Sequence, residues 1–171
     1  MLEPFAGFTP EVATDAFVHT TAVLIGRVTI GAQASVWPNT TLRGDDGWIR
    51  VGACTSIQDG TVIHSTEDLS EARVGDRCTV GHNAIIHGAV VEDDCLIGMG
   101  SVLLDNCVIG TGSLVGAGAL VTSNTVVPPG SLVLGSPAKV VRPVSEREMA
   151  WIAHSWQHYV TRGQQFLAAR R

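Results

Sequence analysis

An aliphatic residue returns every six positions through most of the chain, and this period constrains the fold more than any other feature of the sequence. Three of the units read "IGMGSV", "IGTGSL" and "VGAGAL" and begin at Ile97, Ile109 and Val115. Hexapeptide repeats are typical of a parallel β-helix, in which each unit supplies one short strand and one turn. We therefore predict an all-β core, a parallel β-helix over about residues 12–137. Three units would form each triangular coil, with coils about 4.8 Å apart.

The composition agrees with a narrow core. Only 5% of the residues are aromatic, and 19 of the 171 are glycine. A thin prism has room inside for one aliphatic and one small side chain per unit, but not for Phe or Trp. The fourth residue after the aliphatic is small in most units: Ala34, Thr40, Thr55, Thr61, Cys78, Ala84, Cys95, Ser101, Cys107, Ser113 and Ala119. Three of the four cysteines occupy this position, so we interpret them as reduced structural thiols.

The period changes near residue 143, where a helical pattern begins. Ser145 and Glu148 form the capping box S-x-x-E. We predict a helix over about 146–169 that packs along the prism, with Gly163 as the position where it could be disturbed. The expected organisation is a β-helix over 1–143 and a packed helix over 144–171, forming one domain. The predicted apolar stripe comprises Met149, Ile152, Ala153, Trp156, Tyr159 and Val160.

Charge and hydropathy argue against several kinds of partner. Charged residues make up 16% of the chain and the formal net charge is −5, which argues against nucleic acid or an anionic membrane as a partner. No apolar run approaches the roughly 18 residues of a membrane helix. The start, "MLEPFAGFTP", lacks the basic and apolar regions of a signal peptide. We expect a cytoplasmic protein.

Two insertions interrupt the period beside polar residues. The segment 43–50, "RGDDGWIR", adds three residues between Leu42 and Val51, and the segment 64–73 adds five between Ile63 and Val74. Insertions in a solenoid become surface loops, often on the binding side. We predict that both segments are such loops, at the same corner.

The repeat register brings two histidines together. We label the three faces A, B and C. If both insertions are excursions at a corner, Ile63 and Ile86 lie on face C, one coil apart. His64 and His87 then share one column, and Arg43 lies one coil further along it. Imidazoles stacked in this way can converge on one metal, because the ligands of tetrahedral zinc lie roughly 3.3 Å apart.

A third histidine falls on a different face. His82 follows Val80 on face B, where Asp59 stacks with it and Gln58 stands beside Asp59. It could complete the metal site only if face B of one subunit meets face C of another, and such heterologous contacts close into rings. A triangular prism suggests three subunits. If residues 64–73 instead form one face of a coil, His64 would stack near His82, and His87 would lie apart from them.

Five segments resemble the γ-class carbonic anhydrases and their close bacterial relatives: "LRGDD", "IQDGTVIH", "VGHNAIIHG", "LIGMGSVLLD" and "GSPAKVVRPVSEREMAW". The last is especially similar to the subgroup encoded with phenylacetate-degradation and carnitine operons. The resemblance covers almost the whole chain and implies a left-handed β-helix. The general preference for right-handed crossovers would favour the other hand.

The resemblance also implies a set of site residues. Zn²⁺, or Fe²⁺ in some members, would be bound by His64 and His87 of one subunit and His82 of its neighbour in a homotrimer. Gln58 would orient the metal-bound water and the substrate, and Glu67 matches a loop glutamate that shuttles protons in the archetypal enzyme. The alternative for Glu67 is that it is a solvated loop carboxylate. Tyr159 could overhang the site, and the alternative is that it only packs against the β-helix. A charge network across the interface would comprise Arg43, Asp45 and Asp59.

This site predicts hydration of CO₂ to bicarbonate. Three neutral imidazoles leave an open position on zinc, and the ion lowers the pKa of its bound water to about 7. The loop after His64 is shorter than that of the archetype, which argues against fast turnover. Three alternatives stay open: an acyl-CoA thioesterase on the same metal, a hexapeptide acyltransferase that uses one histidine as general base, and a trimeric module without catalysis.

Overall fold

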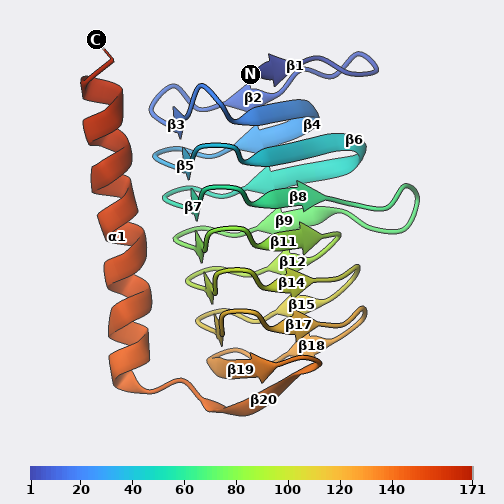
Figure 1. Cartoon of the computed structure of the whole chain (residues 1–171), viewed down its shortest axis with the longest axis vertical. Helices are drawn as coiled ribbons and strands as arrows, with labels where there is room; N and C mark the ends of the chain where they lie inside the picture. The colour runs from blue at the N-terminus through green and yellow to red at the C-terminus, as the bar shows by residue number, and fades with distance from the viewer. Residues whose placement is uncertain (171) are drawn as a thin grey trace.

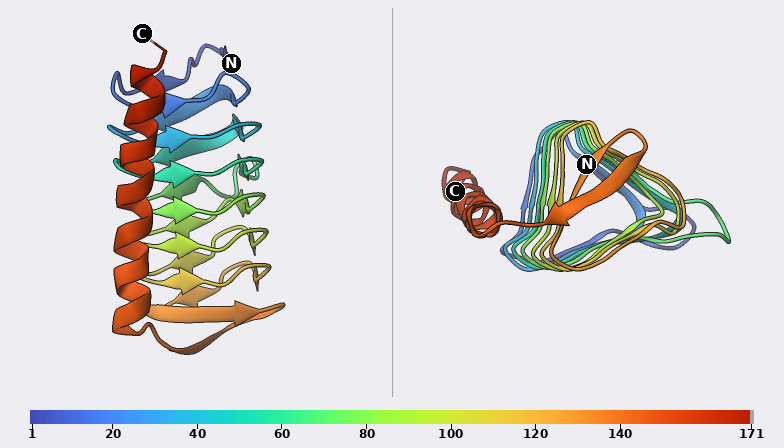
Figure 2. Two further views of the ribbon diagram at one scale, coloured as in Figure 1. Left: turned by 60° about the vertical axis from the view of Figure 1, so that its left-hand side comes forward. Right: turned by 90° about the horizontal axis from the view of Figure 1, so that it is seen from below.

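The computed structural model describes residues 1–170 and forms a left-handed parallel β-helix of about seven coils with one C-terminal helix (Figure 1). Seen along its axis, the coil is a triangle and the helix lies outside it (Figure 2). Strands one coil apart pair in parallel, as with Val102 and Leu120. The fold predicted from the hexapeptide period is therefore confirmed.

Short strands occupy the three faces. Face C holds the first parts of β4 (Val23–Ile30) and β6 (Thr41–Val51), then β8 (Val62–His64), β11 (Ile85–His87), β14 (Val102–Leu103) and β17 (Leu120–Val121). Face A holds the second parts of β4 and β6, then β9 (Ala72–Val74), β12 (Val90–Val91), β15 (Val108–Ile109) and β18 (Val126–Val127). Strands β1 (Leu2–Glu3) and β2 (Glu11–Val12) pair with the two ends of β4.

Face B carries the remaining strands and ends the solenoid. It holds β3 (Phe17–Val18), β5 (Ser35–Val36), β7 (Ser56–Ile57), β10 (Thr79–Val80), β13 (Leu96–Ile97), β16 (Leu114–Val115) and β19 (Ser131–Gly135). The chain then reverses into β20 (Ala138–Pro143), which pairs antiparallel with β19. The six-residue period gives no signal for this reversal.

The core is built as the repeat predicts. Inward aliphatic residues such as Leu42, Ile63 and Ile86 have no exposed surface. The small residues predicted at the second inward position are buried as well, including Cys78, Cys95 and Cys107. All four cysteines are free thiols. Removing this apolar surface from water, at about 25 cal/mol per Å², is the main driving force for folding.

One of the two predicted loops is a strand instead. Residues 43–50 lie within β6, which bends from face C to face A and pairs along β4 in the preceding coil. The pairing includes Gly26 with Gly44 and Ile49 with Val28, with a register shift between Gly26 and Val28. A Cβ on Gly44 would lie 2.7 Å from the carbonyl oxygen of Arg27. The insertion is absorbed because β4 turns the same corner as a continuous strand and offers it hydrogen-bonding partners.

The second insertion is the predicted loop. Residues 65–71 connect β8 to β9 and project from one corner of the triangle (Figures 1 and 2). Strand β9 resumes on face A, between β6 and β12. The insertion therefore does not consume a face, and the alternative register that stacks His64 near His82 is wrong.

Helix α1 (Glu146–Ala168) begins with the predicted capping box, in which Ser145 and Glu148 bind each other's backbone N–H. It packs on face B against β3, β5, β7 and β10. Its buried residues are Ile152, Ser155 and Gly163, so the predicted stripe is only partly correct. Met149 is 49% exposed, and the helix continues through Gly163. Within residues 1–170, no helix is long and apolar enough to cross a membrane.

Candidate metal centre

His64 and His87 lie side by side, as the register predicts. They are paired across β8 and β11, one coil apart. Nδ1 of His64 lies 3.3 Å from Nε2 of His87. The side chain of His64 is 12% exposed and that of His87 is 31% exposed. Two imidazole nitrogens therefore face each other at the corner from which the 65–71 loop projects.

A carboxylate binds the other nitrogen of each ring. Asp45 Oδ1 lies 3.1 Å from His64 Nε2, and both Asp105 oxygens lie 3.2 Å from His87 Nδ1. An ionised carboxylate only accepts hydrogen bonds, so each of these nitrogens carries the proton of a neutral ring. The facing nitrogens, His64 Nδ1 and His87 Nε2, are then both lone-pair acceptors.

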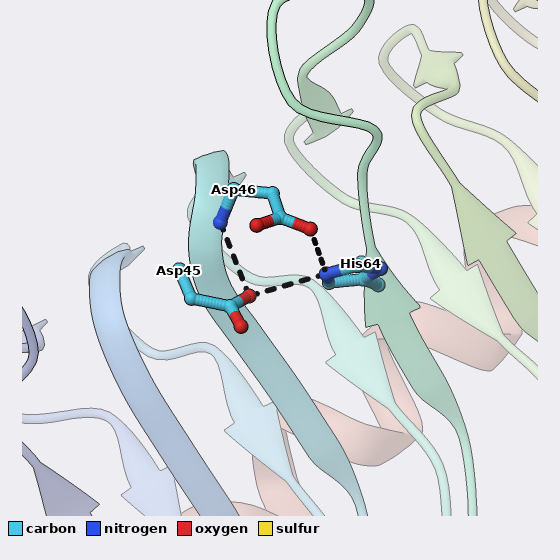
Figure 3. A group of neighbouring side chains, drawn as sticks. All are labelled: Asp45, Asp46 and His64. Carbon is cyan, nitrogen blue, oxygen red and sulfur yellow. Dashed lines mark hydrogen bonds and ion pairs between the residues drawn. The ribbon is translucent and has the colours of Figure 1, made fainter.

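Acidic residues surround His64 on one side (Figure 3). Asp46 Oδ2 lies 3.2 Å from His64 Nε2, so the ring is held between Asp45 and Asp46. Donor atoms of these three residues all lie within 4.8 Å of one another. Asp45, however, is already paired with Arg43 at 2.5 Å. We therefore interpret the two carboxylates as groups that orient His64.

Arg43 joins this network as the column predicts. Its second guanidinium nitrogen lies 3.3 Å from His64 Nδ1. Burial raises the pKa of Asp45, but the hydrogen bond and the charge of Arg43 outweigh burial, and the pKa lies below its ordinary value. A cation at His64 Nδ1 would replace the Arg43 contact there and leave the Arg43–Asp45 pair intact.

Asp105 is a site residue that the sequence interpretation missed. It follows β14, whose Leu103 pairs with Ile86, so the register places it near His87. Ser70 of the projecting loop donates a hydrogen bond of 2.6 Å to Asp105. Burial raises the pKa of Asp105, yet the Ser70 hydrogen bond and the nearby His87 ring hold it below its ordinary value. The sequence signal for Asp105 is the last residue of the "LLD" segment, which stands one position past the histidine column.

His82 lies on face B, apart from the other two histidines. It follows β10, and its Nδ1 lies 3.0 Å from Asp59 Oδ2. Asp59 therefore holds the proton on Nδ1 and leaves the lone pair of Nε2 free. The His82 side chain is 42% exposed. Gln58 is buried beside His82, and both line a groove under α1.

The other two predicted residues lie at the edges of the site. Glu67 is exposed in the 65–71 loop and makes no hydrogen bond or ion pair with any described residue. Tyr159 is half-buried on α1, with its ring 5.7 Å from that of Trp37. Burial and the charge of Asp59 raise the pKa of Tyr159. Tyr159 thus packs and also borders the groove beside His82.

The histidines fit a divalent metal such as zinc. The 3.3 Å between the facing nitrogens equals the ligand separation in tetrahedral zinc, roughly 3.3 Å. Each of His64, His82 and His87 has one nitrogen bound to a carboxylate, the arrangement that fixes metal-binding imidazoles in proteins. Two facing acceptors without a proton between them are unfavourable unless a cation joins them.

Comparisons with known proteins agree with the hexapeptide-repeat fold. Residues 88–123 match the family model "Bacterial transferase hexapeptide (six repeats)". A carbonic anhydrase of Geobacillus kaustophilus is 40% identical over the whole chain and 93% of its own length. The carnitine operon protein CaiE of Salmonella typhimurium is 41% identical over 97% of this chain and 81% of its own.

A solved structure has the same fold as this chain. A hexapeptide transferase family protein from Anaplasma phagocytophilum superposes with a TM-score of 0.93. It is 38% identical and covers 96% of this chain and 97% of its own. The chain belongs to the γ-class carbonic anhydrase family of hexapeptide-repeat proteins. Relatives named as enzymes support an enzymatic role and a metal cofactor.

Proposed function

We propose that this protein is a metal-dependent hydratase of the γ-carbonic anhydrase type, which converts CO₂ to bicarbonate at the interfaces of a homotrimer. Zinc, or Fe²⁺, would be held by His64 and His87 of one subunit and by His82 of the next. The observation that carries the proposal is the 3.3 Å approach of His64 Nδ1 to His87 Nε2, with carboxylates on the opposite nitrogens.

The position of His82 supports a site shared between subunits. His82 lies on face B and the other two histidines at the end of face C, so one chain supplies only part of a three-histidine set. An outward apolar column runs down face C beside them, and Val62 and Ile85 are 38% and 39% exposed. A second subunit would cover such a column and bring its own His82 against it.

The chain's own groups have separate tasks in this proposal. Asp45, Asp59 and Asp105 hold protons on the ring nitrogens that face away from the metal and so fix the orientation of each ring. The Gln58 amide, buried beside His82, can donate to a CO₂ oxygen and accept from water. Arg43 neutralises Asp45. When bound, zinc supplies water activation, lowering the pKa of its bound water to about 7.

A second candidate is hydrolysis of an acyl thioester at the same metal. The observation in its favour is the groove beside His82, which has a volume of about 530 Å³ and an apolar floor that includes Leu96 and Leu114. Pockets of about 300–1,000 Å³ suit organic ligands, whereas CO₂ requires far less space. A hydrolase would use the groove for the acyl or pantetheine chain.

Metal content per chain, measured by mass spectrometry on protein purified anaerobically without chelator, tests the site. We expect about one zinc or iron per chain and a trimeric native mass. His87→Ala should abolish the metal, and His19→Ala, at a partly exposed imidazole on another coil, should not. A metal-free protein that takes up no added zinc would contradict the proposal. CO₂ hydration and acyl-CoA hydrolysis, assayed on the loaded protein, distinguish the two reactions.

A further inference from the structure

The groove beside His82 is lined on one side by face B and on the other by an unusual series of rings on α1. Trp151, His154, His158 and Tyr159 all border it, together with His82 and Gln58. His154 and His158 are exposed residues of α1 that lie outside the predicted apolar stripe. Their shared position on the groove wall is therefore unexplained by the fold, because neither side chain is buried.

The four rings form a continuous series along the helix. The ring centroids of Trp151 and His154 are 5.6 Å apart, those of His154 and His158 are 6.2 Å apart, and those of His158 and Tyr159 are 5.3 Å apart. Both histidines are exposed, whereas Tyr159 is half-buried. The series thus leads from the interior end of the groove to solvent.

The interior end of this series lies close to the candidate site. Tyr159 and His82 border the same groove, and Asp59 binds His82 at 3.0 Å. The titratable groups that border the groove with the helix imidazoles are Tyr159 on α1 and His82 after β10, and Asp59 after β7 is bound to His82. Glu67, in the 65–71 loop, is exposed and makes no hydrogen bond or ion pair with any described residue.

Hydration of CO₂ leaves one proton for each bicarbonate formed, and that proton must reach buffer. An unperturbed imidazole titrates near neutral pH, which suits it to accept and release protons there. One ring nitrogen accepts a proton from groove water while the opposite nitrogen releases one to solvent, and rotation of the ring restores the starting tautomer, so charge and atoms balance over the cycle. Two exposed imidazoles at the mouth of the groove supply this function.

We propose that His158, with His154 beside it, relays the product proton from the groove to solvent. The proposal rests on the proposed function, and it assigns the helix a part in turnover in addition to packing. Exchange of ¹⁸O between CO₂ and water, followed by membrane-inlet mass spectrometry, measures hydration and proton-dependent water release as separate rates in one experiment.

The test variant is His154→Gln/His158→Gln in the metal-loaded protein at low buffer concentration. We expect water release to fall about tenfold or more while the hydration rate stays within about twofold. Added imidazole buffer should restore water release. Metal content and the cobalt(II) absorption spectrum should be unchanged, because these residues do not bind the metal. The matched control is His19→Gln, a partly exposed imidazole that does not border the groove.

Three results would overturn the proposal. Unchanged water release would show that protons leave by another route. A parallel loss of both rates, or a changed cobalt spectrum, would show that the two histidines support the structure of the site. A metal-loaded wild-type protein without any hydration would remove the proposed function itself, and the relay with it.

Discussion

His64 Nδ1 and His87 Nε2 lie 3.3 Å apart although the residues are 23 positions apart in the sequence. One coil and the five residues inserted before β9 account for the separation, and the parallel pairing of β8 with β11 places one ring above the other. The candidate site therefore depends directly on the repeat. A change that shifts the register of one coil would separate the two rings.

Asp105→Asn should weaken metal binding. The carboxylate holds the proton on His87 Nδ1, and loss of such a partner typically costs 10–100-fold in metal affinity. We expect a loss of about that size in zinc affinity, measured by competition with a chromophoric chelator. Asp68→Asn is the control, since Asp68 is exposed in the loop without a described partner. Equal affinities for wild type and Asp105→Asn would show that Asp105 does not act on His87.

Gly88→Ala should lower the stability of the protein more than Gly100→Ala does. Both glycines have positive φ, +59° and +64°, so alanine is strained at each, by about 1–2 kcal/mol. A Cβ at Gly88 would also collide with Ser70 Oγ and Asp105 Oδ1, whereas nothing lies within 4 Å at Gly100. We expect the Tm of Gly88→Ala to lie at least about 3 °C below that of Gly100→Ala. Equal values of Tm would mean that the loop moves away from the added methyl group without loss of stability.

Gly163→Ala should stabilise the protein. The added Cβ would lie 3.4 Å from Phe17 Cβ and 3.5 Å from Ser35 Cβ, which is ordinary contact. Alanine is favoured over glycine within a helix by about 0.8–1.0 kcal/mol. We expect a higher Tm for Gly163→Ala and a lower one for Gly163→Leu, whose branch has no space against β3 and β5. A lower Tm for both would show that helix docking requires closer contact than this distance indicates.

The helix cap should lose its contribution in acid. The Arg142 hydrogen bond, together with the Ser145 backbone and hydroxyl, lowers the pKa of Glu148 from 4.5 to about 2. Because the folded-state value is the lower one, the contribution is complete above about pH 4.5 and is lost as pH falls toward 2. The urea midpoint of wild type should exceed that of Glu148→Gln at pH 6, and the difference should shrink by about pH 3. A pH-independent difference would contradict this account.

The column of inward aliphatics predicts most of the residue arrangement at the candidate site. Period and insertion length placed His64, His87 and Arg43 in one column and put His82 with Asp59 on another face, and the strand pairing agrees. Period alone could not choose between the two registers for residues 64–73. The structure decides this, because β9 has hydrogen-bonding partners only on face A.

The pattern of inward residues does not predict several other features of the structure. The 43–50 segment is a strand because β4 presents a matching edge, which no local propensity encodes. Asp105 was missed because it stands one position past the column and reaches His87 by its side chain. On α1, helical periodicity selected apolar residues, whereas Gly163, which carries no side chain, is buried against face B beside Phe17.

Subunit complementation tests the shared site most directly. His64→Ala and His82→Ala proteins are each prepared, shown to be folded and free of metal, then mixed in equal amounts under conditions that exchange subunits. A complete site requires His64 and His87 from one subunit and His82 from its neighbour, so random mixing should rebuild about one site in four. We expect zinc binding to return to about a quarter of the wild-type content per chain. No recovery of zinc after verified exchange would contradict a metal site built between subunits.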